Sequence, residues 1–159
     1  MPRKDTPTLE PGRIVLGTTP AAWASKPLVT HLVQLGTPNL GTPCADWGIR
    51  HGAHSFLMPA TEELTTTFAR EFDRQVKDTR GVKVSALAGH VGDGACLGFD
   101  LGYAGEQFEG DGIVPVESVH AQQLGLLNDG FRVQEGLYHT QMTSSPEAFN
   151  SWVKPHLEQ

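Results

Sequence analysis

The feature that most constrains the fold is a series of four short runs of apolar and β-branched residues, separated by segments long enough to hold helices. The runs are Arg13–Leu16, Val29–Leu35, Val82–Leu87 and Phe131–Glu135. Parallel strands need long crossover connections, and strands that are covered on both faces read as apolar runs. The sequence therefore predicts an α/β fold with about four mostly parallel strands and flanking helices.

Helical spacing predicts which side chains cover this sheet. Leu64, Phe68, Phe72 and Val76 recur every four residues, as on the buried stripe of an amphipathic helix that Gly81 ends. A last helix is expected from Ser145, with Phe149 and Trp152 docked on the sheet. Short helices are expected at Ala21–Lys26 and Ser118–Leu127, whereas 41–59 and the glycine-rich 89–112 are expected to be loops.

Length and charge limit the domain organisation and the partners. We expect a polar, disordered lead at residues 1–11 and one domain at 12–159. Twelve basic residues against 18 acidic ones give a net charge of −6, which argues against nucleic acid as a partner. No run approaches the roughly 18 apolar residues of a membrane span, and no signal peptide is evident.

Two segments suggest chemistry. Asp111 opens the segment DGIVPVES, which ends at Ser118, and His139 lies in the segment YHTQM, which ends at Met142. A Ser-His-Asp site needs a carboxylate that orients an imidazole, and an imidazole that takes a proton from the nucleophile. Alone, Asp111 is a turn residue and His139 a loop histidine, but their order and flanks favour the acid and base positions. We predict that the two side chains lie within hydrogen-bond distance, roughly 2.6–3.2 Å.

A third segment extends this pattern. Residues 36–43 read GTPNLGTP, which resembles the segment after the sixth strand of bacterial lipases and esterases of the α/β-hydrolase superfamily. With DGIVPVES and YHTQM it gives three landmarks in the family's order, which cover only the C-terminal half of such a domain. The resemblance implies hydrolysis of carboxylic esters, an ester or lipid substrate, no cofactor and no metal. Relatives of this type are commonly secreted, whereas the chain as it stands has no export signal, so the location stays open.

The nucleophile of the family is the feature that this sequence lacks. The family places a serine in a strand-turn-helix elbow that reads G-x-S-x-G, upstream of the acid. No such pentapeptide precedes Asp111, and Thr19 occupies the corresponding position, between Gly17 and Ala21. A β-branched Thr19 suits the strained turn badly, and Pro20 has no N–H to serve as an oxyanion donor.

Other reactive side chains leave alternatives open. Cys44 and Cys96 follow neighbouring predicted strands and are either a disulfide or two free thiols. His51 and His54 lack a third metal ligand, so we expect no metal site there.

Three hypotheses about function remain. The chain is a hydrolase fragment with little activity of its own, a pseudoenzyme that binds a lipid or acyl ligand, or an interaction module. In the last case a partner or a second copy covers an open sheet edge. An in-frame G-x-S-x-G in the DNA upstream of Met1 would favour the first.

Overall fold

The computed structural model describes residues 29–51, 58–75, 79, 81–94, 96, 108–122 and 125–158. The centre of the described part is a parallel three-stranded sheet of β1 (His31–Leu35), β2 (Lys83–His90) and β5 (Gly130–Glu135), in the order β1-β2-β5. Leu35 pairs with Leu87, and Ala88 pairs with Val133. The predicted α/β fold with parallel strands is confirmed for these three, whereas the run Arg13–Leu16 and the boundary at residue 11 lie outside the described residues.

Strand β2 is central because its side chains are small or apolar on both faces. Ala86 and Ala88 point to one face and Leu87 to the other, and all three are fully buried. Alternate residues of a strand face opposite sides, so a continuous apolar run is what a strand covered on both faces requires. This strand therefore connects the two apolar clusters of the core.

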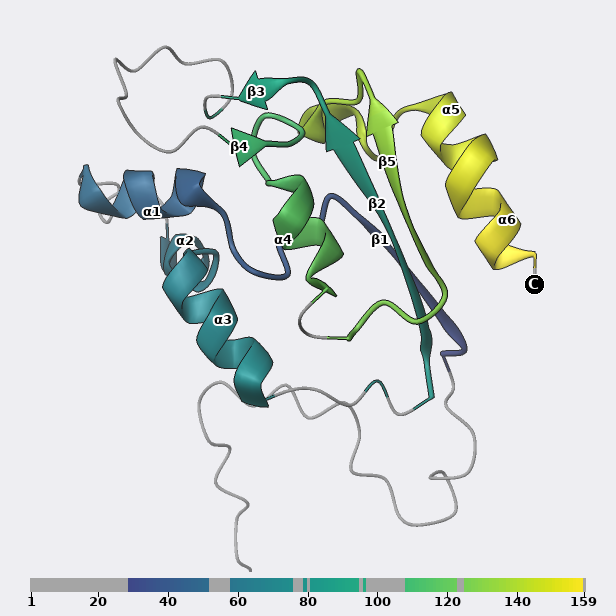
Figure 1. The fold of residues 1–159 in the computed structure, drawn as a ribbon, viewed down its shortest axis with the longest axis horizontal. Helices are drawn as coiled ribbons and strands as arrows, with labels where there is room; N and C mark the ends of the chain where they lie inside the picture. The colour runs from purple at the N-terminus through teal and green to yellow at the C-terminus, as the bar shows by residue number, and fades with distance from the viewer. Residues whose placement is uncertain are drawn as a thin grey trace, which may run out of the picture.

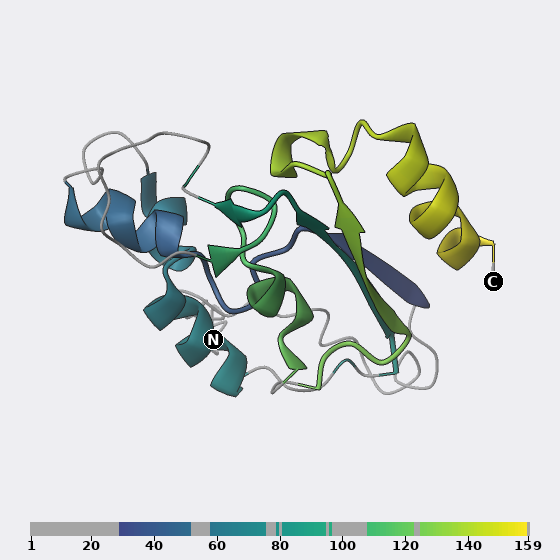
Figure 2. The ribbon, with the colours of Figure 1, turned by 45° about the horizontal axis from the view of Figure 1, so that its top comes forward.

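Different elements cover the two faces (Figures 1 and 2). On one face, Val114 and the helix α4 (Val116–His120) pack against Ala86 and Ala88. On the other face, Leu87 packs against Leu137, Met142 and a C-terminal helical segment. That segment consists of α5 (Pro146–Ala148), the π-helical turn η6 (Phe149–Val153) and α6 (Lys154–Leu157).

The prediction for the last helix is partly right. Ser145 caps α5 by accepting a hydrogen bond from the Ala148 N–H, and Pro146 occupies the first turn. Trp152 packs against the buried cluster around Leu87, as expected. The prediction for Phe149 is wrong, because its side chain is exposed.

The segment between β1 and β2 differs most from the sequence-based expectation. Part of the predicted loop is a helix, α1 (Pro43–Arg50), which begins where the Thr42 side chain accepts a hydrogen bond from the Cys44 N–H. The predicted long helix is two helices, α2 (Met58–Glu63) and α3 (Thr66–Gln75). The break is capped, because Thr65 Oγ1 accepts a hydrogen bond from the Phe68 N–H.

The expected apolar stripe of this helix does not cover the sheet. Leu64, Phe68 and Phe72 are 42%, 45% and 37% exposed, whereas Val76 lies outside the described residues. In Figure 1, α3 lies beyond α4, which itself occupies this face of the sheet. Phe68 and Phe72 lie on one helix as predicted, but Leu64 lies in the break before it, and the predicted packing of these side chains on the sheet is wrong.

Two further features complete the fold. The expected glycine-rich loop contains a short antiparallel pair, β3 (Asp93–Gly94) with β4 (Phe108–Glu109). Cys44 and Cys96 form a disulfide, with Cα atoms 5.5 Å apart, that joins the start of α1 to the segment after β3. Of the two states that the sequence allows for these cysteines, the structure has the bonded one. No helix among the described residues is long and apolar enough to cross a membrane.

Candidate active site

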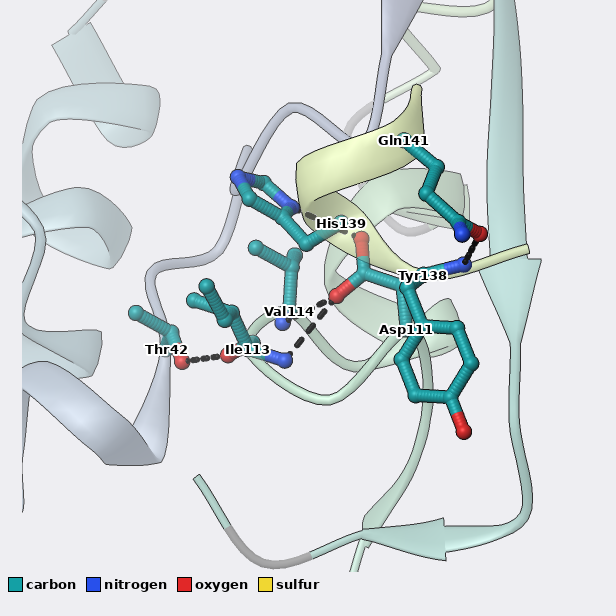
Figure 3. Close-up of polar contacts among 7 residues, drawn as sticks. All are labelled: Thr42, Asp111, Ile113, Val114, Tyr138, His139 and Gln141. Carbon is teal, nitrogen blue, oxygen red and sulfur yellow. Dashed lines mark hydrogen bonds and ion pairs between the residues drawn. The ribbon is translucent and has the colours of Figure 1, made fainter. Parts of the chain in front are cut away.

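Asp111 lies in a tight turn between β4 and α4, and its carboxylate is fixed by the backbone of that turn. Oδ1 accepts hydrogen bonds from the N–H groups of Ile113, at 3.0 Å, and Val114, at 2.7 Å (Figure 3). Gly112 has a φ of +91°, which non-glycine residues rarely adopt, and so lets the chain reverse direction at this point. Only 1% of Asp111 is exposed, so these bonds orient a carboxylate that water scarcely reaches.

His139 follows β5 and opens the short 3₁₀-helix η5 (His139–Gln141). Its ring Nδ1 lies 2.8 Å from Asp111 Oδ2, and its backbone N–H donates to the Asp111 carbonyl oxygen at 3.0 Å. Both the ring and the backbone of His139 are therefore bound to the same residue. The contact predicted between the two side chains is confirmed as a contact, whereas its role in catalysis stays a prediction.

The electrostatics of the pair suit a general base. The hydrogen bond to Asp111 raises the pKa of His139, burial opposes this, and the charge of Asp111 adds to the increase. A carboxylate acceptor at Nδ1 holds the neutral imidazole in the tautomer that carries its proton there. Nε2 is then the nitrogen free to take a proton, and in Figure 3 it points away from Asp111. The His139 side chain is 33% exposed, so a reacting group can reach it.

The GTPNLGTP and DGIVPVES segments, distant in sequence, are joined by hydrogen bonds. The Ser118 hydroxyl accepts from the Leu40 N–H at 3.0 Å and donates to the Gly41 carbonyl oxygen at 2.6 Å. The Thr42 hydroxyl donates to the carbonyl oxygen of Ile113 (Figure 3). The turn that holds Asp111 is thus anchored to the loop after β1. Sequence reasoning missed this role of Ser118 and Thr42, although both lie within the quoted segments.

No nucleophile is identified among the described residues. Thr19, at the elbow position, lies outside them. The described serines near the sheet have other roles or surroundings: Ser118 binds the loop after β1, Ser145 caps α5 and Ser85 is buried in β2. No hydroxyl group of the described residues hydrogen-bonds to the His139 ring. The site within the described residues is therefore a carboxylate–imidazole pair.

The described residues also hold no cluster of three or more potential metal ligands. His51, at the end of α1, stacks on Trp47 with ring centroids 4.3 Å apart, and its Nδ1 lies 2.9 Å from the Trp47 carbonyl oxygen. His54 lies outside the described residues.

The described part has an α/β fold, a parallel sheet with helices on both faces, and the Asp–His pair lies on the loops after two of its strands. Comparison with solved structures agrees: the mature form of the lipase BlEst2 from Bacillus licheniformis matches with a TM-score of 0.56 and 22% sequence identity. The match covers 80% of this chain and 54% of the lipase chain, so this chain spans about half of that protein. No protein-family model and no curated protein sequence matches it.

Proposed function

We propose that this chain carries the acid–base part of a carboxylic ester hydrolase of the lipase or esterase type. The observation that carries the proposal is the buried Asp111 carboxylate, oriented by two backbone N–H groups and 2.8 Å from His139 Nδ1. A hydroxyl nucleophile is activated by an imidazole whose second nitrogen is accessible and whose first nitrogen is bound to a carboxylate in a fixed orientation. The fold shared with a lipase supports an ester as the substrate class.

In this mechanism His139 transfers the proton and Asp111 supports it. His139 Nε2 takes the proton of the attacking hydroxyl and later gives it to the leaving alkoxide, while Asp111 stabilises the imidazolium that forms between these steps. The two residues cannot form an acyl-enzyme by themselves, because neither supplies the attacking oxygen. Thr19 is a poor candidate for that role for the backbone reasons given above.

The first test measures hydrolysis of p-nitrophenyl butyrate by the purified chain and by His139→Ala. The proposal predicts little or no turnover, because a base without a positioned hydroxyl leaves the acyl-transfer step unassisted. Turnover that disappears in His139→Ala would show that this chain holds a nucleophile after all, and labelling with a fluorophosphonate would identify it. Robust turnover that survives His139→Ala would contradict the role of the pair.

A second candidate, an interaction module, is favoured by a separate observation. The large apolar side chains of Leu64, Phe68 and Phe72 are each exposed. Among the described residues, β1 also pairs with a strand on one side only. Exposed apolar surface and free strand edges are features that proteins usually cover.

Light scattering tests this candidate through the mass of the purified chain in solution. Self-association through the exposed surface predicts a mass above that of one chain, which Leu64→Ser/Phe68→Ser lowers to that of one chain. Phe149→Ser, at an exposed phenylalanine on the C-terminal segment, is the matched control and should leave the mass unchanged. A monomeric wild-type chain would contradict self-association.

A further inference from the structure

A glycine lies directly beneath the Asp111–His139 pair. Gly36 follows the last residue of β1, and a Cβ atom at this position would lie 2.9 Å from Asp111 Oδ2 and 3.1 Å from His139 Nδ1. These are the two atoms that form the hydrogen bond of the pair. The third neighbour is the terminal methyl group of Met142, at 3.3 Å. The space that a side chain at position 36 would fill is therefore occupied by the pair itself.

The backbone at Gly36 cannot easily move away from the pair. Its N–H donates to the Leu87 carbonyl oxygen at 2.9 Å, which ties it to the buried central strand. An added methyl group would therefore be accommodated by the atoms above it, which are the ends of side chains. Gly89, in β2, differs because a Cβ there would lie 2.0 Å from the backbone oxygen of Leu137, as well as 2.9 Å from Asp111 Cβ. A side chain at Gly89 would therefore collide with the backbone, whereas a side chain at Gly36 would meet side-chain atoms, two of which form the hydrogen bond of the pair.

We infer that Gly36 is a positioning residue, whose missing side chain lets the carboxylate of Asp111 and the imidazole of His139 meet over the end of β1. The inference rests on the proposed function, in which this pair is the acid and base. It gives the first glycine of GTPNLGTP a role in the site. The positive φ of +57° at Gly36 is a separate reason for glycine, so the experiment must separate the two.

Gly125 provides the matched control. Its φ is +61°, close to that of Gly36, and a Cβ there would have no neighbour within 4 Å in the described part of the chain. Gly36→Ala and Gly125→Ala therefore carry similar backbone strain, but only the first places a methyl group against the pair. The readout is an NMR pH titration of the His139 ring, assigned by the signal that is lost in His139→Ala, with Asp111→Asn as the reference for a broken pair.

Each outcome has a distinct meaning. We expect the midpoint of the His139 titration to lie at a higher pH in wild type than in Asp111→Asn. In Gly36→Ala this midpoint should move most of the way to the Asp111→Asn value. In Gly125→Ala it should equal that of wild type. A wild-type titration equal to that of Asp111→Asn would refute the pair, and with it the proposed function. A raised titration that Gly36→Ala leaves unchanged, or that both alanine variants lower equally, would refute the role of Gly36 alone.

A double-mutant cycle keeps the inference testable if Gly36→Ala folds poorly. Without the imidazole, part of the crowding at position 36 disappears. Gly36→Ala should therefore lower the unfolding midpoint less in the His139→Ala background than in wild type, whereas Gly125→Ala should lower it equally in both. An equal loss from Gly36→Ala in both backgrounds would contradict the inference.

Discussion

Asp111 combines three side-chain hydrogen bonds with almost complete burial. Two backbone N–H groups hold Oδ1, and the His139 ring holds Oδ2. A buried carboxylate is costly unless such donors surround it, so the turn and His139 together make its charged form tolerable. The same contacts that stabilise the charge also fix the direction in which Oδ2 faces.

Asp111→Asn should reveal the charge interaction through its pH dependence. Asp111 raises the pKa of His139 above its usual 6.5, so its stabilisation is complete below that pH and is lost as the pH rises through the raised value. Urea unfolding should therefore show a larger loss of unfolding free energy in Asp111→Asn at about pH 5.5 than at about pH 9. An equal loss at both pH values would contradict the interaction.

Ser118→Ala tests the connection between the two segments that frame the site. The substitution leaves the buried Leu40 N–H and the Gly41 carbonyl oxygen without their side-chain partner, at a cost of about 1–3 kcal/mol. Ser144→Ala is the control, since Ser144 is exposed and should change the unfolding free energy by less than about 0.5 kcal/mol. Similar losses in the two variants would show that the Ser118 bonds contribute nothing specific.

These residues show how far the sequence could predict the site. The order and flanks of Asp111 and His139 correctly predicted that the two side chains are in contact. This prediction was possible because parallel strands bring the loops at their carboxyl ends to one edge of the sheet. The anchoring by Ser118 and Thr42 could not be predicted, since it depends on side-chain directions across segments far apart in sequence. The crowding at Gly36 is likewise visible only in three dimensions.

At the scale of elements, α3 shows why the rest of the prediction failed. The spacing of Phe68 and Phe72 correctly indicated a helix, but such a spacing says only that one face is apolar, not which element packs against that face. Val114 and α4, rather than this stripe, cover Ala86 and Ala88 of the sheet. The helix α1 was missed because its eight residues include a proline and a glycine, which in a sequence indicate turns and loops.

The buried face of α3 carries an unexpected carboxyl group. Asp73 is 6% exposed, and its Oδ2 has no hydrogen-bond partner among the residues that the structure describes. Burial raises the pKa of Asp73 from 3.8 to about 6. Because the folded chain holds this proton more tightly than the unfolded chain, stability falls as the pH rises from 3.8 to about 6 and stays lowered above that.

Asp73→Asn should therefore stabilise the protein, but only at pH values above the range in which Asp73 ionises. The expected gain in unfolding free energy is up to about 3 kcal/mol at about pH 8, at roughly 1.4 kcal/mol per pKa unit, and close to zero at about pH 4. Urea titrations at the two pH values measure it. A gain that is independent of pH would mean that burial does not disfavour the charged form of Asp73.

The whole chain corresponds to part of the length of the matched lipase. It covers 54% of the matched lipase chain, and its described part supplies three parallel strands and the Asp–His pair. We propose that this pair can act as acid and base once a nucleophile is positioned beside His139. A variant that restores a nucleophile elbow at the position indicated by the sequence tests this proposal.

The variant Thr19→Ser/Pro20→Ala/Ala21→Gly changes the segment that starts at Gly17 to the pattern G-x-S-x-G and restores an N–H after the nucleophile. The measurement is hydrolysis of p-nitrophenyl butyrate by this variant, by the same variant with His139→Ala, and by the unsubstituted chain. We expect turnover above that of the unsubstituted chain, abolished by His139→Ala. With one oxyanion donor missing, the rate should stay about 100- to 1,000-fold below that of a complete lipase. No gain in turnover, or a gain that survives His139→Ala, would show that Asp111 and His139 do not act as the acid and base.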